Sequence, residues 1–323
     1  MTGESAAAKR EFELTSVRIQ ELRLSPVVGN FDAVHLREIN RRIFQDMPRA
    51  SSWVPAGQQS DTVAPGEYRP TVFKGDWVKN RKIEIRNSDS LVAYSAMGLS
   101  AKTKLDEVLA TAKPARLAPL DTKTFAAEIA EIYKNLDYIH PFPDGNSRTL
   151  REFTRQLAEE SGYKIDWERF NQTQEMRDML CIARDKSVNE IALPNAKMEV
   201  TMRNILASMA RYRADQALPE LLQNSIRPLR AIAFENLKEQ GALKAHPELK
   251  GVYAGLKNAD AALKKNYPAN PVLQEAAIQQ LKTKIVQQLN TGALMETPAR
   301  VRPAQQSSAP AERGKPPERD PQR

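Results

Sequence analysis

The sequence predicts a mainly helical protein with one short β-hairpin, followed by a second helical region of different character. Apolar residues recur at intervals of three or four through most of the chain, which is the helical period. Residues with strand character are concentrated in one stretch, Tyr68–Ile85, where β-branched and aromatic side chains gather. Prolines and glycines cluster in residues 50–75, which predicts loops and turns there.

The first elements are a polar lead-in and a helix. Residues 1–30 are polar, with some helical potential. Apolar side chains at the helical spacing predict a helix over residues 31–47, and Pro48 ends it because proline is a helix breaker.

The hairpin is expected within Tyr68–Ile85. Its turn has two candidates in the sequence, at Lys74-Gly75-Asp76 and at Lys79-Asn80.

Helices then follow one another. A helix over residues 121–139 has Asp121 as its expected N-cap and one continuous apolar face. Pro141 stops it, because the residue before a proline disfavours the helical region. The next helix runs from about Ser147 to Glu160, with Gly162 as a C-terminal signal. The other expected helices cover residues 91–109, 168–187 and 196–213, and two apolar faces cover residues 218–232 and 272–289.

These elements predict the following organisation: a lead-in at 1–30, a main domain at 31–213, a helical C-terminal region at 214–290 and a tail at 291–323. The tail is rich in proline and poor in large apolar residues, so it cannot offset the entropy of ordering and is expected to be flexible.

Composition limits the class of protein. The formal net charge of +8 favours acidic partners such as nucleotides, nucleic acid or acidic proteins, and a soluble protein that is basic without an electrostatic role is an equally good interpretation. Cys181 is the only cysteine, which excludes an intramolecular disulfide and a cysteine-rich metal site and suits a reducing cytosol. No apolar run approaches the roughly 20 residues that span a bilayer, so we expect a soluble cytoplasmic protein without a membrane partner.

The loop between the helices at 121–139 and 147–160 carries the candidate chemistry. Asp144-Gly145-Asn146 combines residues that tolerate positive φ, so successive backbone N–H groups can point into one concavity. That concavity lies at a helix N-terminus, which favours an anion such as phosphate. His140 has an ordinary pKa near 6.5 and suits a general base, whereas His35 and His246 are expected to be structural or turn residues.

The following helix adds cations to this loop. Arg148, Arg151 and Arg155 fall on one helical face, where charge-assisted contacts would bind an anion. Asp144 alone would repel phosphate, but a Mg²⁺ ion that bridges both would turn repulsion into binding.

His140-Pro-Phe-Pro-Asp-Gly-Asn-Ser-Arg148-Thr-Leu-Arg151 resembles the Fic motif, His-x-Phe-x-Asp/Glu-Gly-Asn-Gly-Arg-x-x-Arg. The segment Phe31–Leu36 is similar to the first helix of that family, and Val72–Gly75 is similar to its target-positioning flap. The resemblance covers about residues 15–210. It implies a Fic-type helical bundle that transfers AMP from ATP, with Mg²⁺, to a Ser, Thr or Tyr hydroxyl of a target protein.

The resemblance also implies a role for each matching residue. His140 would deprotonate the target hydroxyl, Phe142 would anchor the loop and Asp144 would hold Mg²⁺. Lys74 and Gly75 would register the target segment. The anion site would consist of Gly145, Asn146 and the Ser147 amide, with Arg148 on the β-phosphate and Arg151 on the γ-phosphate. Ser147 departs from the usual glycine, although its amide can act in the same way.

Regulation is expected to come from outside the chain. Many Fic proteins carry an inhibitory Ser/Thr-x-x-x-Glu-Gly/Asn helix, and the nearest match here, Glu235-Asn236, has Ala231 at the Ser/Thr position. We therefore expect a toxin or effector that is controlled by a separate antitoxin.

Three alternatives stay open. The transferred group could be another nucleotide or phosphate, although the Ala-Asn-Lys pattern of phosphate-transferring relatives is absent. The chain could also be a catalytically silent Fic scaffold. Residues 215–290 faintly resemble the C-terminal segments of relaxases and type IV secretion signals, which would make the protein a translocated effector, but we favour a helical appendage that packs on or near the Fic domain.

Overall fold

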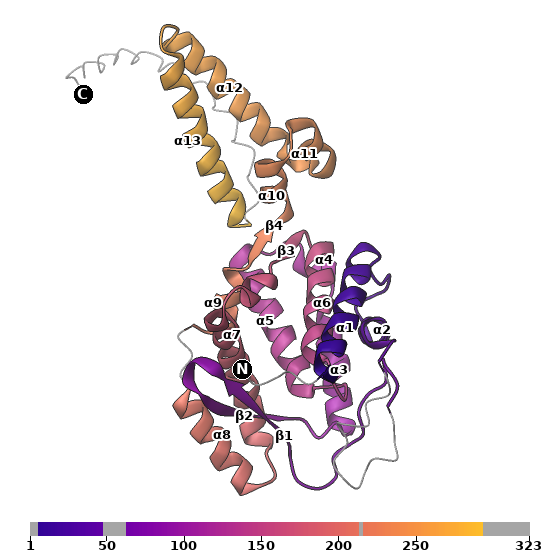
Figure 1. Ribbon diagram of the computed structural model, residues 1–323. Helices are drawn as coiled ribbons and strands as arrows, with labels where there is room; N and C mark the ends of the chain where they lie inside the picture. Colours follow the sequence, from indigo (N-terminus) through magenta and orange to yellow (C-terminus); the bar gives the residue numbers. More distant parts are fainter. Residues whose placement is uncertain (1–5, 48–62, 213–215, 293–323) are drawn as a thin grey trace, which may run out of the picture. The chain divides into compact units, whose positions relative to one another are not determined.

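Helices make up most of the fold, as the sequence predicts (Figure 1). The structure is a computed structural model that describes residues 6–47, 63–212 and 216–292. The helices are α1 Ala6–Leu24, α2 Ala33–Phe44, α3 Leu99–Thr111, α4 Pro114–Leu117, α5 Thr122–Ile139, α6 Asn146–Glu160, α7 Gln174–Ala192, α8 Glu199–Arg211, α9 Leu218–Gln223, α10 Leu229–Asn236, α11 Glu239–Ala245, α12 Lys250–Asn266 and α13 Pro271–Asn290. The strands are β1 Trp77–Ile83, β2 Ser88–Tyr94, β3 Tyr163–Ile165 and β4 Ile226–Pro228.

α5 and α6 lie at the centre of the main core, and both agree with the sequence prediction. Asp121 caps α5 by accepting a hydrogen bond from the Thr124 backbone N–H at 2.8 Å. Gly162 follows α6 with a φ of 84°, a backbone conformation that glycine adopts without a steric penalty. The loop 140–145 joins the C-terminus of α5, where His140 is the C-cap, to the N-terminus of α6, where Gly145 is the N-cap.

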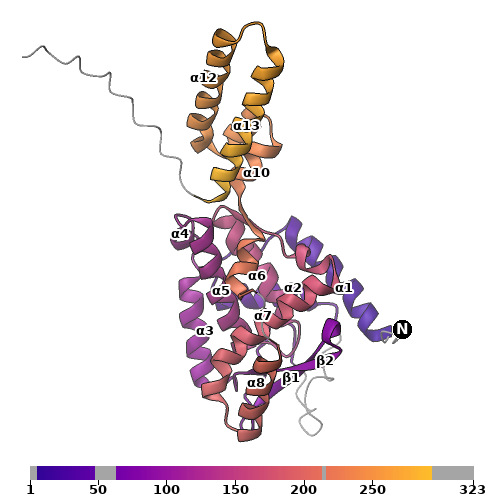
Figure 2. The ribbon, with the colours of Figure 1, turned by 90° about the vertical axis from the view of Figure 1, so that its left-hand side faces the viewer.

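The main core surrounds α5 (Figure 2). α2, α3, α6 and α9 all contribute side chains that are almost completely buried with those of α5. Representative residues are Ile39, Leu105, Tyr133, Phe153 and Leu222. Burial of such side chains contributes about 1.5–3 kcal/mol each, which fixes the helices that carry the loop.

The observed hairpin lies further along the chain than the predicted one. β1 and β2 are antiparallel, with Trp77 opposite Tyr94 and Ile83 opposite Ser88. The turn therefore lies at 84–87, where Asn87 has a φ of 43°, and not at Lys74-Gly75-Asp76 or Lys79-Asn80. Lys79 and Asn80 are inside β1.

The start of the helix predicted over 91–109 is also wrong. Residues 91–94 belong to β2, and α3 begins at Leu99. The side chain of Asn189 on α7 accepts from the Ala93 backbone N–H and donates to the Leu91 carbonyl. On α8, the Ser208 hydroxyl accepts from the Leu91 N–H. These partners hold the segment as a strand.

Other boundaries differ from the predicted ones. The segment described as a polar lead-in forms α1, whose Leu22 is buried in the main core. Residues 168–171 form a separate 3₁₀ turn before α7. The predicted apolar face over 218–232 is interrupted by β4, which ends at Pro228 and pairs with β3.

A second, smaller core lies after β4. It includes Phe234 of α10, Leu249, Tyr253 of α12, and Ile285 and Leu289 of α13. The domain bounds predicted from the sequence stay predictions, and the tail from residue 293 onward lies outside the described residues. Within the described part, no helix has the length and apolar character needed to cross a bilayer.

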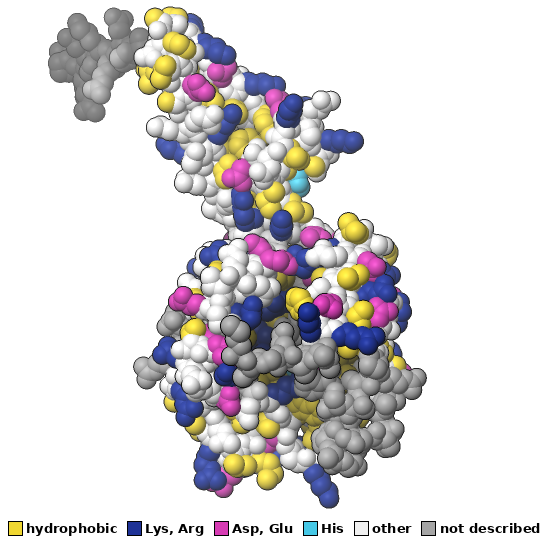
Figure 3. All heavy atoms as spheres, viewed as in Figure 1, with side chains coloured by type: hydrophobic (Ala, Val, Ile, Leu, Met, Phe, Trp, Pro, Cys, Tyr) yellow, Lys and Arg dark blue, Asp and Glu magenta, His cyan; other side chains and the backbone are white. Residues whose placement is uncertain are grey.

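The charged side chains are mixed on the face seen in Figure 3, where Lys and Arg lie among Asp and Glu. The net charge of +8 is therefore not gathered into one basic patch among the described side chains of that face.

Candidate functional site

The loop from His140 to Gly145 is held in its shape by backbone geometry and hydrogen bonds. His140 ends α5 with a φ of 49°, and its carbonyl accepts a 2.6 Å hydrogen bond from the buried Arg69 Nε. The Asn146 side chain bonds both the N–H and the carbonyl of Phe142, at 3.0 and 2.8 Å. Phe142 is fully buried, so it anchors the loop in the core.

Gly145 is required at its position for two reasons. Its φ is 69°, and a Cβ atom there would lie 1.8 Å from Cζ of Phe44. The absence of a side chain therefore lets the backbone of the loop approach Phe44 of α2 closely before it turns into α6.

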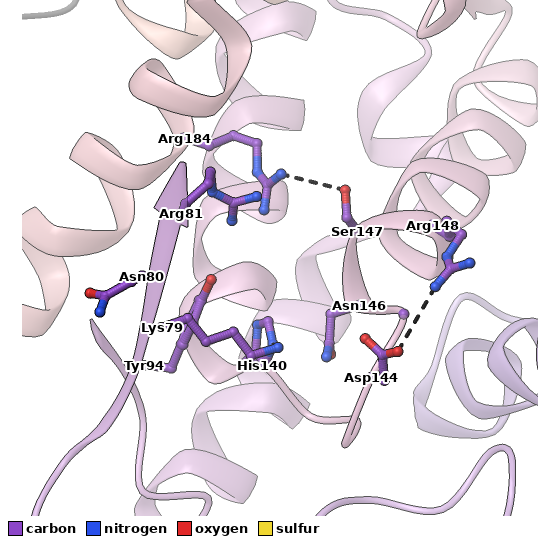
Figure 4. A pocket seen from close by; sticks show the side chains of 11 residues that line it. Lys79, Asn80, Arg81, Tyr94, His140, Asp144, Asn146, Ser147, Arg148 and Arg184 are labelled. Atoms are coloured by element: carbon purple, nitrogen blue, oxygen red, sulfur yellow. Dashed lines mark hydrogen bonds and ion pairs between the residues drawn. The ribbon is translucent and has the colours of Figure 1, made fainter. Parts of the chain in front are cut away.

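A cavity of about 220 Å³ opens between this loop, the hairpin and α7 (Figure 4). β1, β2, the loop, α6 and α7 all contribute side chains to its walls. Its lining consists of Lys79, Asn80, Arg81, Tyr94, His140, Asp144, Gly145, Asn146, Ser147, Arg148 and Arg184. Four of these side chains are cationic and one is a carboxylate, which favours an anionic ligand. Three of the cations, Arg81, Arg148 and Arg184, also form ion pairs with carboxylates of the chain.

His140 faces this cavity with a neutral ring. It is 5 % exposed, and Tyr94 stacks on it with ring centroids 3.9 Å apart. Its Nε2 lies 3.3 Å from Lys79 Nζ. Burial lowers the pKa of His140 to about 4, with Asp137 acting against the shift and Lys79 adding to it. The neutral imidazole has one ring nitrogen that can accept a proton, although the lowered pKa makes it a weaker base than an exposed histidine.

The opposite wall of the cavity is the N-terminus of α6. The first backbone N–H groups of a helix have no partner within it, so those of Asn146 and Ser147 can bind an anion. Arg184 reaches in from α7, and its Nη1 lies 3.4 Å from Ser147 Oγ.

Asp144 lies beside this anion site, with its Oδ2 4.0 Å from Arg148 Nη2. Burial raises its pKa, whereas a hydrogen bond from the Gly145 backbone opposes the rise. In residues 6–47, 63–212 and 216–292 no three His, Cys, Asp or Glu side chains are grouped to hold a metal ion. One carboxylate fits a Mg²⁺ ion that arrives with a phosphate ligand, because Mg²⁺ is commonly bound by one or two carboxylates and substrate phosphates.

Arg148 is already paired within the chain. It forms an ion pair with Glu11 of α1, donates to Thr15 Oγ1 at 3.0 Å and lies over the Phe44 ring. An anion that binds Arg148 therefore competes with Glu11. Neither residue of α1 carried a recognisable signal in the sequence, since Glu11 is 137 positions from its partner.

Arg148, Arg151 and Arg155 do line one face, as predicted. They contribute to a second cavity of about 770 Å³, which α1 also lines. Arg151 lies over the Trp167 ring, 5.6 Å from its centroid, and its Nε is buried without a hydrogen-bond partner in the described part of the chain. The two cavities share Arg148.

The structure thus brings six of the predicted site residues around one cavity. They are His140, Asp144, Gly145, Asn146, Ser147 and Arg148. Arg151 borders the neighbouring cavity, and Lys74 and Gly75 precede β1, whose later residues line the first cavity instead. Sequence reasoning missed Lys79, Tyr94 and Arg184, which are distant from the motif.

Comparisons with known proteins point to the same segment. Residues 30–158 match the Fic/DOC family. The chain is similar to the protein adenylyltransferase VbhT of Bartonella schoenbuchensis, with 31% identity over 47% of this chain and 26% of that protein. It is also similar to the Escherichia coli protein named "Probable protein adenylyltransferase Fic", with 26% identity over 49% of this chain and 64% of that protein.

Among solved structures, the chain is similar to BepC of Bartonella tribocorum with bound AMPPNP. The identity is 16%, the TM-score 0.44, and the match covers 71% of this chain and 90% of that chain. The matched part spans less than two thirds of the length of either curated relative.

Proposed function

We propose that this protein, whose residues 30–158 match the Fic/DOC family, transfers AMP from ATP to a Ser, Thr or Tyr hydroxyl of a target protein. Two similar proteins have names that include protein adenylyltransferase. These names support both the reaction class and AMP as the transferred group.

One observation carries the proposal: a neutral buried histidine faces a helix N-terminus across a cationic cavity. His140 Nε2 points to the side where Lys79 lies, and the α6 amides of Asn146 and Ser147 form the facing wall (Figure 4). A general base next to a phosphate cradle is the arrangement that activates a hydroxyl beside a bound nucleotide.

In the proposed reaction His140 Nε2 takes the proton of the target hydroxyl. The hydroxyl oxygen then forms a bond to the α-phosphorus of ATP, and the bond to the bridging oxygen breaks, so pyrophosphate leaves. Arg148 would bind the β-phosphate and Arg151 the γ-phosphate. Orientation and charge neutralisation account for most of the rate in such chemistry.

Mg²⁺ would be held by Asp144 together with the phosphates. The ion would supply charge neutralisation when bound. Asp144 suits this role because its side chain lines the cavity beside the α6 N-terminus, and an adjacent cation would offset the burial that raises its pKa. Lys74 and Gly75 would register the target segment before β1.

Radiolabelled ATP tests the proposal. The purified chain is incubated in a cell lysate with α-labelled or with γ-labelled ATP. AMP transfer labels a protein from the α-position only. Label from the γ-position only would show that the reaction is phosphate transfer and not AMP transfer. No label from either form of ATP would support the silent scaffold or the transfer of another nucleotide.

The rate of transfer is expected to stay constant between about pH 8 and about pH 6. His140 acts as a base only when neutral, and burial lowers its pKa to about 4, so it stays neutral over this range. An ordinary histidine would be roughly three quarters protonated at about pH 6. Initial rates at saturating ATP measure this, and a midpoint near pH 6.5 would contradict the buried setting of His140.

Glu11→Gln is expected to tighten nucleotide binding by roughly two- to five-fold, because it removes the carboxylate that competes for Arg148. Calorimetric titration with a non-hydrolysable ATP analogue measures the change. The control is Glu13→Gln, since Glu13 is an exposed residue of the same helix that pairs with Lys9. Equal affinities for both variants would show that Glu11 does not compete with the ligand.

Control by a separate antitoxin is part of the proposal. The cavity beside Arg151 contains both cations and apolar surface, including Phe12 and Trp167, and an inhibitory glutamate would reach Arg151 there. A small protein encoded beside this chain is expected to reduce the labelling when it is added. Robust labelling that no such protein reduces would count against this control. Delivery through residues 215–290 stays a prediction. Its test is whether a chain without residues 215–323 still passes through a type IV secretion system, and unchanged passage would contradict it.

A further inference from the structure

The Nδ1 side of His140 faces a carboxylate that does not belong to the motif. Asp137 lies in the last turn of α5, and its Oδ1 is 3.7 Å from His140 Nδ1. Both atoms are buried, and neither has a hydrogen-bond partner within the described residues; at 3.7 Å their contact is electrostatic and longer than a hydrogen bond. His140 is the left-handed C-cap of α5, three residues after Asp137, so both side chains lie at the C-terminal end of that helix.

Asp137 is itself fixed by Arg184. Its Oδ2 accepts two hydrogen bonds, from Arg184 Nη2 at 2.7 Å and from Nε at 3.1 Å. Asp137 is 1 % exposed and Arg184 is 3 % exposed. Burial alone would raise the pKa of Asp137, but the charge of Arg184 and the nearby His140 outweigh it and hold the pKa below its ordinary value. The group is therefore a carboxylate with one oxygen directed at His140.

The other ring nitrogen of His140, Nε2, lies 3.3 Å from Lys79 Nζ. When Lys79 is an ammonium it has only N–H donors, so the contact of its Nζ with His140 Nε2 favours a lone pair on that nitrogen. A neutral imidazole then carries its proton on Nδ1, toward Asp137. Tyr94 stacks on the ring with an interplanar angle of 29° and limits its rotation.

We propose that Asp137, oriented by Arg184, is a positioning residue that keeps the proton of His140 on Nδ1 and the lone pair of Nε2 toward the cavity. Its catalytic meaning rests on the proposed function. The target hydroxyl takes the place of Lys79 Nζ beside Nε2 and gives its proton to that nitrogen, as its oxygen bonds to the α-phosphorus and pyrophosphate leaves. The imidazolium that forms is stabilised by Asp137 through Nδ1–H.

The replacement Asp137→Asn tests whether Asp137 sets the tautomer of His140 or only fills space beside it. Arg184 offers only donors, so the new amide is expected to turn its oxygen to Arg184 and its NH₂ group to His140 Nδ1. That amide donates where the carboxylate accepted, which moves the imidazole proton to Nε2. Transfer is then expected to fall by about 10²-fold or more, the size of a general-base contribution.

The double variant Asp137→Asn with Arg184→Met is the matched rescue. Without the guanidinium, the amide oxygen is free to face Nδ1, and methionine fills much of the vacated volume. The tautomer is expected to return to Nδ1–H even if loss of Arg184 from the cavity keeps transfer slow. This readout would not follow from a merely structural role.

¹⁵N NMR of labelled imidazoles in the full chain measures the tautomer. Three histidines give few resonances, and the spectrum of His140→Ala identifies the signals of His140. The expected result is a proton on Nδ1 in the unmodified chain, on Nε2 in Asp137→Asn and on Nδ1 in the double variant. A proton on Nε2 in the unmodified chain, or the same tautomer in all three, overturns the proposal. If the tautomers behave as expected but no AMP is transferred, the proposed function fails and the positioning role stands.

Discussion

His140→Ala is expected to lower AMP transfer by roughly 10²–10⁴-fold, which is the range that a general base contributes. The side chain is 5 % exposed, its Nε2 faces the cavity and burial keeps it neutral. No other histidine can replace it, because His35 is buried against Gln156 and His246 lies beside Glu248 in the C-terminal helices. Initial rates of target labelling at saturating ATP measure the loss.

Two measurements show whether His140→Ala loses the general base alone or also the structure of the site. His246→Ala is the matched control and is expected to keep the rate of the unmodified chain. Binding of an ATP analogue to His140→Ala should remain, since the α6 amides and the arginines are unchanged. A His140→Ala variant that labels its target at the original rate would sink the assignment of His140 as the base.

Gly145→Ala is the second change with a large expected effect. A Cβ atom would lie 1.8 Å from Cζ of Phe44, and the φ of 69° is strained for any residue with a Cβ. Backbone strain and overpacking together are expected to cost about 2–5 kcal/mol of the free energy of unfolding. Transfer should also be lost, because relief of the clash displaces the N-terminus of α6. Denaturant midpoints and labelling rates measure the two effects.

Gly162→Ala is the control for strain alone. Gly162 also has a positive φ, 84°, but nothing lies within 4 Å of a Cβ atom there. It is expected to lose only about 1–2 kcal/mol and to keep full transfer. Equal losses of stability in both variants, with transfer retained in Gly145→Ala, would show that the close approach to Phe44 is unimportant.

The helices around the site were predictable because their signals are local. Asp121 is an N-cap that acts on the next turn, and Pro141 lies two residues after Ile139, the last apolar residue with helical spacing before the loop. The loop from Asp144 to Asn146 was likewise readable, since positive φ at Gly145 follows from the residue type. Such signals depend on neighbours within about one turn of helix.

The hairpin was predicted with the wrong strands for a physical reason. Leu91-Val92-Ala93-Tyr94 is a short apolar run, which periodicity alone cannot assign to a helix or a strand. It becomes β2 because β1, Asn189 of α7 and Ser208 of α8 supply its hydrogen bonds. Strand formation depends on such tertiary partners more than on intrinsic preference.

The rest of the site could not be predicted, since its contacts join distant parts of the chain. Glu11 reaches Arg148 from α1, and Arg184 reaches Asp137 from α7. Lys79 meets His140 only because the hairpin has the register observed here. A single sequence shows the charges at these positions but not which of them pair.

Peptide mass spectrometry with adenine-labelled ATP tests the central claim most directly. A lysate is incubated with the chain and with ATP in which the adenine nitrogens are ¹⁵N, beside an unlabelled sample. The account predicts a peptide whose Ser, Thr or Tyr side chain carries an AMP group that contains the heavy adenine, and the absence of that peptide with His140→Ala. A modified peptide that carries phosphate without adenine, or a nucleotide that lacks the heavy adenine, would contradict it.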